Sequence, residues 1–450
     1  MNKKIPVSKN LKKLATIFNK PLYIVGGYVR DSLLDYKPTD IDLASTLTPD
    51  EVMQILENTE YKVKETSPKL MTLKIIVDDE AYEYTTFRKE TYQKGHSPDT
   101  VIPTMDIVED AKRRDFRMNA IYYNINADEI IDPLDGIADI KDRVINTVDS
   151  PQKVFSQDGL RLMRLARMAA QLGFIVSIKT MEGARENAML IDDIAPERIR
   201  DELDLILVAD TVHNIEYSHK KGLMILDLIY VLERILPELT LGKGMVQRAD
   251  FHKYDVFFHI INTVKYADSK VRLAALMHDI GKPKCYKDNG RYFKHEEVGA
   301  RMTKEILGRL RYPNKTINYV AQLVLYHMYD LRCDAKLSTL KLFVQEHRDI
   351  LEDLFLLKQA DSLGGGIFSN ENPSIIRIRD VYHKMIEDKI PFTIKDLYID
   401  GKAVEEFPPK MRGDVLLELL RECAINENLL TEEAQRKFIQ KQLQKYKKKV

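Results

Sequence analysis

Every strand-like segment that we recognise lies in the first third of this chain, and that distribution limits the possible folds more than any other feature. Helical stretches such as Pro49–Asn58 lie between these segments, and after Asp149 the pattern becomes helical, with apolar residues three and four apart. We therefore expect an α+β protein, with a mixed sheet and helices followed by an all-α remainder. The strand-like runs are Leu22–Val25, Met71–Val77, Ala81–Phe87 and Ala120–Ile125.

The chain has 450 residues, more than one compact core normally contains, which predicts several domains. Breaks in the helical pattern at Gly364–Gly366 and Pro408–Pro409 help to divide its second half. We expect four parts, which are a head at residues 1–147, a helical neck at 148–245, a helical body at 246–388 and a helical tail at 389–450.

Composition limits the setting of the protein more than its function. Basic and acidic residues balance at 69 each, so any surface for nucleic acid must be local. The three cysteines lie far apart and match no zinc or disulfide spacing, and no run approaches the ~20 apolar residues of a membrane span. We expect a cytoplasmic protein without a membrane partner.

A glycine pair and an aspartate pair predict a nucleotide site near the N-terminus. Gly26 and Gly27 allow close approach of a ligand to the backbone, and the guanidinium of Arg30 suits phosphate oxygens. Asp40 and Asp42 would face the same side of a strand. Crowded carboxylates suit Mg²⁺, and paired ions clamp the attacking and leaving oxygens of a displacement. Turn glycines beside surface aspartates are the alternative interpretation.

Two further pairs fit the same chemistry. Arg113 and Arg114 could hold a triphosphate, or could form an exposed ion-pair cluster. Asp158 and Arg161 would share one face of a helix. Cytosine and adenine each present an amino donor beside a ring-nitrogen acceptor, whereas uracil and guanine present the reverse order. An Asp/Arg pair therefore matches C and A, although an intrahelical salt bridge is the alternative.

Histidines and aspartates gather in the helical half of the chain. Imidazole and carboxylate groups from separate helices suit a transition metal, and a metal-bound water can attack a phosphate ester. Any single histidine here could instead be a packed core residue. The residues concerned are His259, His278, Asp279, His295, His327 and Asp361.

Taken together, these motifs closely resemble the class II (bacterial-type) tRNA nucleotidyltransferases, the CCA-adding enzymes, with an HD phosphohydrolase domain. The resemblance covers nearly the whole chain. Its motifs appear at Gly26–Asp31, Asp40 and Asp42, Arg113–Phe116, Asp158–Arg161 continuing to Arg164 and Arg167, and Glu197–Leu203, and its HD metal ligands map onto His259, His278, Asp279 and Asp361.

The resemblance implies a polymerase-β-like head, a neck that selects the nucleobase, and an HD body. It implies transfer of CMP, CMP and AMP from CTP and ATP to the 3′ end of tRNA, with Mg²⁺ at Asp40 and Asp42. Glu83 is a further candidate carboxylate. The HD site would hold a transition metal of unassigned identity and hydrolyse cyclic or 3′-terminal phosphates. The oligomeric state is left open.

The sequence departs from the family at two positions and leaves alternatives open. Gln157 stands where the family usually has an acidic residue, and Arg117 where it usually has threonine. The segment 88–101 is similar in length to a flexible loop that CC-only relatives lack, which favours addition of C, C and A. An A-adding or CC-adding enzyme, a poly(A) polymerase, and a phosphohydrolase whose head only binds RNA are the alternatives.

Overall fold

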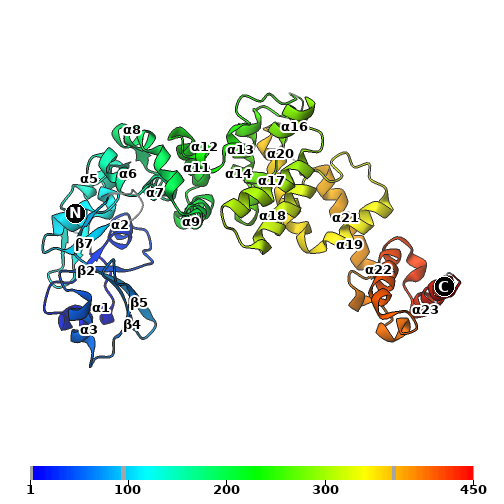
Figure 1. Cartoon of the computed structure of the whole chain (residues 1–450), viewed down its shortest axis with the longest axis horizontal. Coiled ribbons are helices and arrows are strands. Elements are labelled where there is room, and N and C mark those ends of the chain that lie inside the picture. The colour runs from blue at the N-terminus through cyan, green and yellow to red at the C-terminus, as the bar shows by residue number, and fades with distance from the viewer. Residues whose placement is uncertain (1–3, 93–97, 249, 251, 367–370, 449–450) are drawn as a thin grey trace. The chain divides into compact units, whose positions relative to one another are not determined.

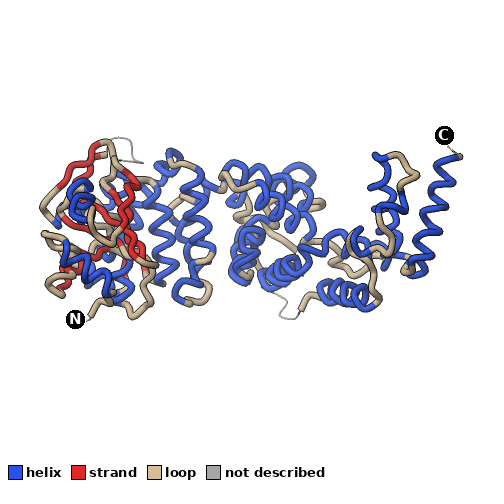
Figure 2. The backbone as a smooth tube through the Cα atoms, turned by 90° about the horizontal axis from the view of Figure 1, so that it is seen from below, coloured by secondary structure: helices blue, strands red, loops and turns tan. Residues whose placement is uncertain are grey.

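The computed structural model describes residues 4–92, 98–248, 250, 252–366 and 371–448 and divides the chain into two compact units (Figure 1). Unit 1 comprises residues 1–240 and 309–312, and unit 2 comprises residues 241–308 and 313–450. Figure 2 shows the strands in unit 1, whereas the described part of unit 2 consists of helices and loops. The predicted α+β class is confirmed. The finer division into head, neck, body and tail stays a prediction.

A seven-stranded mixed sheet in the order β3-β4-β5-β2-β1-β8-β9 forms the base of unit 1. β1 (Tyr23–Val25) runs antiparallel to β2 (Asp42–Ser45) and to β8 (Tyr122–Asn124), and β2 runs parallel to β5 (Glu80–Thr86). All four predicted strands are present, with ends displaced by one or two residues. The remaining strands are β3 (Lys62–Ser67), β4 (Thr72–Val77) and β9 (Glu129–Ile131).

Alternation along the strands explains why they form a half-buried sheet. In β5 the side chains of Tyr82, Tyr84 and Thr86 are buried, whereas Ala81 and Glu83 are exposed and Thr85 is half-buried. The other strand pairs of unit 1 are small. The hairpin of β6 (Arg88–Thr91) and β7 (Thr100–Pro103) frames the segment 88–101, of which residues 93–97 lie outside the described residues, and β10 (Val144–Ile145) pairs in parallel with β11 (Ile175–Val176).

The helices of unit 1 complete the sheet and then form a helical layer around α7 (Leu160–Leu172). Most α7 side chains are buried, and the helix packs against α9 (Pro196–Leu207) and α11 (Ser218–Leu228). Pro196 is the first residue of α9, as its missing amide hydrogen favours. The other helices are α1 (Lys9–Ile17), α2 (Gly27–Leu33), α3 (Pro49–Leu56), α4 (Ile107–Lys112), α5 (Gly136–Asp142), α6 (Pro151–Gln157), α8 (Ile178–Glu186), α10 (Ala209–His213), α12 (Leu232–Ile235) and α13 (Pro237–Thr240).

Unit 2 is built around α14 (Val256–Tyr266), which packs against α15 (Arg272–Met277) and α20 (Leu351–Gly364). α20 ends at the predicted glycine break, where the Gly364 backbone lies so close to α14 that an added Cβ would sit 2.3 Å from Thr263 Oγ1. The other helices are α16 (Lys282–Asn289), α17 (His295–Arg309), α18 (Asn314–Tyr326), α19 (Leu337–His347), α21 (Pro373–Glu387), α22 (Pro409–Ile425) and α23 (Glu432–Lys447).

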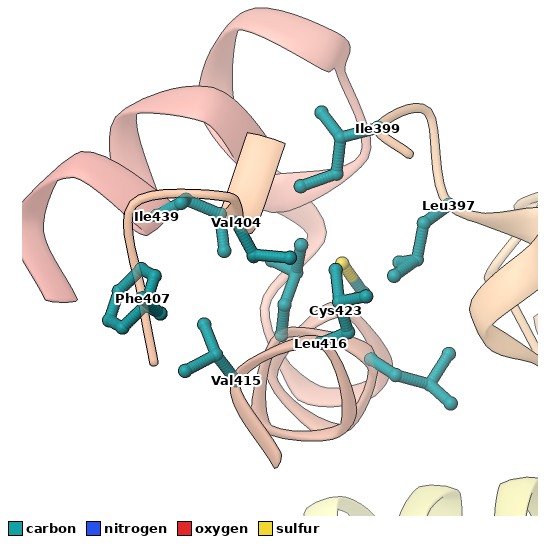
Figure 3. Close-up of a cluster of buried hydrophobic side chains, with 10 residues drawn as sticks. Leu397, Ile399, Val404, Phe407, Val415, Leu416, Cys423 and Ile439 are labelled. Carbon is teal, nitrogen blue, oxygen red and sulfur yellow. The ribbon is translucent and has the colours of Figure 1, made fainter. Parts of the chain in front are cut away.

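A separate apolar cluster holds the C-terminal helices together (Figure 3). Pro409 is the first residue of α22, as the Pro-Pro turn predicted, and Leu419 and Cys423 of this helix are fully buried against Ile439 of α23. Cys423 thus serves as a small apolar side chain rather than as a metal ligand or disulfide partner. Among the described residues, no helix is long and apolar enough to cross a membrane.

Candidate functional site

A glycine turn at the end of β1 begins the candidate nucleotide site. Gly26 has a φ of +84°, a conformation that side chains disfavour, and α2 starts at the next residue. A Cβ on Gly26 would lie 3.5 Å from Asp42 Oδ2 and 4.0 Å from Arg114 Nη1. The turn therefore brings backbone next to both a carboxylate and a guanidinium, and a side chain there would narrow the space between them.

The three candidate carboxylates lie together beside this turn, but not as the spacing predicted. Of the aspartate pair, only Asp42 belongs to β2, and the expectation that Asp40 shares the strand is wrong. The reason is that β2 pairs with β1 from Val25↔Asp42 onward, and beyond Val25 the Gly26 turn leaves the sheet. Glu83 is the direct neighbour of Asp42 in the register of β5.

The positive charge near Asp40, Asp42 and Glu83 does not balance the negative charge of their carboxylates. Burial raises the pKa of Asp42 to about 6; Arg114 opposes this shift, whereas Glu83 and Asp40 add to it. A divalent cation with oxygen ligands would satisfy these groups and favour the ionised form of Asp42. The residues present therefore fit a magnesium site.

Both members of the predicted arginine pair donate hydrogen bonds to one buried acid. Asp110 in α4 is fully buried and accepts hydrogen bonds from Arg113 Nε at 2.7 Å, Arg114 Nη2 at 3.2 Å and the Tyr122 hydroxyl at 2.6 Å. Burial would raise the pKa of Asp110, but Arg113 and Arg114 outweigh it and lower the pKa to about 2. Asp110 was not among the residues predicted from the sequence, although an acid three and four residues before an arginine pair is a usable helical signal.

Arg30 is positioned in a similar way. Its Nη1 donates to Asn119 Oδ1 at 2.7 Å and its Nε donates to Asp31 Oδ1 at 2.7 Å. The Arg30 side chain is buried. It lines the same cavity as Gly27 and Arg114. Three arginines are thus fixed in orientation before any ligand is bound.

Asp158 and Arg161 do not share a helix face as predicted. Asp158 has an extended backbone between α6 and α7, because Gly159 begins the turn into α7 and Leu160 N bonds to Asp158 Oδ1. Its Oδ2 pairs with Arg198 Nη2 at 3.0 Å. Arg161 instead donates to the carbonyls of Val154 and Arg113 and to Gln157 Oε1.

Gln157 therefore takes one of the acceptor roles beside Arg161 in the position where the family usually has an acid. Arg164 and Arg167, further along α7, also have protein partners. Arg164 pairs with Asp115 at 2.6 Å and so connects α7 to the arginine-pair segment, and Arg167 pairs with Glu202 of α9 at 2.6 Å.

One cavity of about 1070 Å³ within unit 1, here called the head cavity, is lined by every residue predicted for the nucleotide site. Glu90 and Tyr92 also line it. No sequence signal pointed to them, but Glu90 lies 3.6 Å from Arg113 Nη1, and the Arg161 guanidinium lies 5.9 Å from the centre of the Tyr92 ring. The predicted residues lining the cavity are Gly26, Gly27, Arg30, Asp40, Asp42, Glu83, Arg113, Arg114, Asp158, Arg161, Arg164 and Arg167.

A second cluster, here called the histidine–aspartate centre, lies in unit 2. It comprises His259, His278, Asp279, His295, His327 and Asp361, so all four predicted ligands and both further histidines come together. His259 lies on α14 and Asp361 on α20, whereas His278 directly follows α15. The ligand atoms of these three residues lie within 4.8 Å of one another, which fits a metal ion with nitrogen and oxygen ligands.

The two carboxylates of the centre attract positive charge from the groups around them. Burial would lower the pKa of His278, but Asp279 and hydrogen bonds to Asp279 and Asp361 raise it to about 10. In Asp279 burial is likewise outweighed, by Lys282 and His278, which hold its pKa well below the ordinary value. Lys282 Nζ lies 2.6 Å from Asp279 Oδ2 and 2.7 Å from Gln247 Oε1.

The head cavity in a mixed-sheet fold and the histidine–aspartate centre in a helical fold agree with what comparison with known proteins finds. Residues 22–146 match the family described as the poly A polymerase head domain, and residues 257–365 match the HD domain. Residues 173–240 match a family described as a probable RNA- and SrmB-binding site of polymerase A. These three matches agree with the resemblance to bacterial-type tRNA nucleotidyltransferases that the motifs indicated.

Among curated relatives, the CCA-adding enzyme of Limosilactobacillus fermentum is 39% identical over 193 residues, which are 43% of this chain and 47% of that protein. The A-adding tRNA nucleotidyltransferase of Deinococcus radiodurans is 33% identical over 273 residues, 57% of this chain and 60% of that protein. The chain thus spans about half the length of the curated relatives it matches.

Solved structures share the fold. The Bacillus stearothermophilus CCA-adding enzyme in complex with CTP matches with a TM-score of 0.67 at 21% identity, covering 97% of each chain. The Thermotoga maritima CCA-adding enzyme complexed with a tRNA matches with a TM-score of 0.57 at 17% identity, covering 98% of this chain and 97% of that one.

Proposed function

We propose that this protein adds CMP, CMP and AMP from CTP and ATP to the 3′ end of tRNA. The observation that carries the proposal is the head cavity, in which the carboxylates, the oriented arginines and the base-selecting candidates Asp158 and Arg161 line a single space. The names of the relatives, which include CCA-adding and A-adding enzymes, support the same substrate class.

Each group of residues would have its own role in the reaction. Asp40 and Asp42, with Glu83 beside them, would hold Mg²⁺, which when bound supplies positive charge to the reacting oxygens. Arg30, Arg113 and Arg114 would bind the triphosphate from the orientations in which their protein partners hold them. Asp158 would accept a hydrogen bond from the amino group of C or A, and Arg161 would donate to the neighbouring ring nitrogen.

An incorporation assay tests this proposal and separates it from the alternatives. The purified protein is incubated with each labelled NTP and with tRNAs that end before CCA, after C, or after CC. We expect CMP on the first two tRNAs and AMP on the third. Addition of AMP alone would indicate an A-adding enzyme, CMP alone a CC-adding enzyme, and a long adenylate tail a poly(A) polymerase. No incorporation of any nucleotide would favour the remaining alternative, a phosphohydrolase whose head only binds RNA.

We further propose that the histidine–aspartate centre hydrolyses 2′,3′-cyclic or 3′-terminal phosphates. Either group would block the hydroxyl that the head extends, so its removal would complement tRNA repair. The convergence of His259, His278 and Asp361 around Asp279 favours this activity. The test is hydrolysis of 2′,3′-cAMP with Ni²⁺, Co²⁺, Mn²⁺ and Mg²⁺; no turnover with any of these ions would contradict the assignment.

A further inference from the structure

We propose that His213 is a positioning residue for nucleotide addition. Through Asp31 it orients the phosphate-binding candidate Arg30, and through Tyr36 it holds the segment that leads to Asp40. His213 is the last residue of α10 and lines the head cavity. It was not among the residues predicted from the sequence. The inference deepens the proposed function of the head cavity and rests on it for the reaction.

The contact between Arg30 and Asp31 is the first observation. Arg30 Nε and Nη2 both lie 2.7 Å from Asp31 Oδ1. The two residues are consecutive in α2, and consecutive residues of a helix do not face each other. The contact therefore depends on a neighbour that keeps the Asp31 carboxylate turned toward Arg30. His213 is such a neighbour, because its Nε2 lies 3.9 Å from the same Asp31 Oδ1.

The stacking of His213 on Tyr36 is the second observation. The centroids of the two rings are 3.9 Å apart, and the ring planes are only 14° from parallel. Tyr36 follows α2, and its backbone N–H donates to the carbonyl of Asp31 at 2.9 Å, so the chain turns back onto this helix before it reaches Asp40. The stack thus fixes the plane of the imidazole and connects α10 to the segment that carries Asp40.

Burial and charge at this cluster fit a neutral imidazole. The side chain of His213 is 6% exposed, and those of Arg30 and Asp31 are 9% and 13% exposed. Burial lowers the pKa of His213; Asp31 opposes this shift, and Arg30 adds to it. A neutral ring adds no second positive charge, so it leaves Arg30 as the ionic partner of Asp31.

The helical layer around α7 therefore contacts Arg30 in two ways. Met168 Sδ of α7 lies 3.4 Å from Arg30 Nη1. His213 acts on the same guanidinium through Asp31, and its helix α10 packs directly against α7. The base-selecting candidate Arg161 also lies on α7. The layer that would read the nucleobase thus also orients a group that would bind the phosphates.

Equilibrium dialysis of the full chain with labelled CTP and Mg²⁺, without tRNA, tests the inference. His213→Phe keeps a ring on Tyr36 but removes the nitrogen that faces Asp31, whereas His213→Ala removes both contacts. His213→Phe should weaken CTP binding about 2–5-fold, and His213→Ala about 10-fold. Only His213→Ala should also raise the Mg²⁺ concentration for half-maximal incorporation, because it releases the segment before Asp40. Thr211→Ala, at an exposed residue of the same helix, is the matched control and should bind CTP as wild type does.

A double-mutant cycle separates positioning through Asp31 from a general loss of structure. In an Asp31→Asn background, where the carboxylate that holds Arg30 is gone, His213→Phe should have little further effect on CTP binding. Equal CTP binding by wild type and His213→Ala, or additive effects of His213→Phe and Asp31→Asn, would overturn the inference and leave the proposed nucleotide addition in place. No CTP binding by the wild type would overturn both.

Discussion

The head cavity and the histidine–aspartate centre both contain acidic groups that suit a cation, but they differ in the exposure and the type of their ligand atoms. In the head, Asp40 and Glu83 are exposed and Asp42 is half-buried, and all offer oxygen. In unit 2, Asp279 and the histidines are buried and offer mainly nitrogen. Exposed oxygen ligands suit an ion that enters with the substrate, whereas buried nitrogen ligands suit a resident ion.

The largest expected effect comes from removing a ligand of the head cavity while the histidine–aspartate centre is left unchanged. Asp42→Asn keeps the side-chain volume but removes a charged metal ligand. Mutating a residue that only hydrogen-bonds to a metal ligand typically costs about 10–100-fold in activity, so the rate of nucleotide addition should fall by more than that. The measurement is labelled CMP incorporation, with hydrolysis of 2′,3′-cAMP as the control that should survive. Near-normal incorporation by a folded Asp42→Asn protein would refute the assignment of Asp42.

The second test removes a ligand of the histidine–aspartate centre and leaves the head cavity unchanged. His278→Ala removes an imidazole nitrogen from the buried centre and should abolish tight metal binding and hydrolysis, while CCA addition continues. Metal analysis of the purified variant and the two activity assays check this. If metal and hydrolysis both persist, the ligands have been assigned wrongly; if addition is lost as well, the two sites are not independent.

A third prediction sharpens the account of the head by asking what Asp158 recognises. Asp158→Ala removes the proposed acceptor for the amino groups of C and A. Hydrogen bonds to charged groups contribute about 1.5–3 kcal/mol each, so discrimination against UTP and GTP should drop about 10–150-fold. Competition among all four NTPs measures the effect.

Arg198→Gln is the matched control for this experiment, because it removes the ion-pair partner of Asp158 but keeps the carboxylate. It should preserve base choice. Equal relative use of the four NTPs by wild type and Asp158→Ala would show that the base is selected elsewhere.

The smallest expected effect concerns stability. The pKa of Asp110 is lowered to about 2 in the folded protein, below its ordinary value of 3.8, so its ionised form stabilises the fold above about pH 4. That contribution is lost as the pH falls toward 2. From a shift of nearly two units we expect it to be about 2 kcal/mol at pH 7.

Urea unfolding of wild type and Asp110→Asn at pH 7, 5 and 3 tests this prediction. The difference in the free energy of unfolding should be largest at pH 7 and smaller at pH 3. A difference that does not change with pH would mean that the Asp110 carboxylate contributes packing rather than charge.

The sequence predicted local features better than partners. The strands and the glycine turn at Gly26 follow from residues adjacent in the chain, and the motifs of both sites were recognisable. The choice of partner depends on packing between distant elements. Spacing alone suggested that Asp158 and Arg161 share a helix face, whereas the fold brings Arg198 of α9 to Asp158 and assigns Arg161 to backbone carbonyls.

The same limit applies to the second site. The clustering of His295 and His327 was visible in the sequence, but no spacing rule says that both face the second oxygen of Asp279. That relation depends on the rotation of one carboxylate between four helices. Sequence patterns identify which groups are present, and only tertiary structure fixes how they are oriented.

The bond from a histidine Nδ1 to the carbonyl three residues earlier has a consequence for folding. His278 and His327 each stand directly after a helix, and their Nδ1–H groups satisfy carbonyls of that helix's last turn. The direction of each Nε2 is therefore constrained by a contact within a single helix end. A metal ion bound at the centre would link these helix ends, so its removal should loosen their packing and leave the individual helices intact.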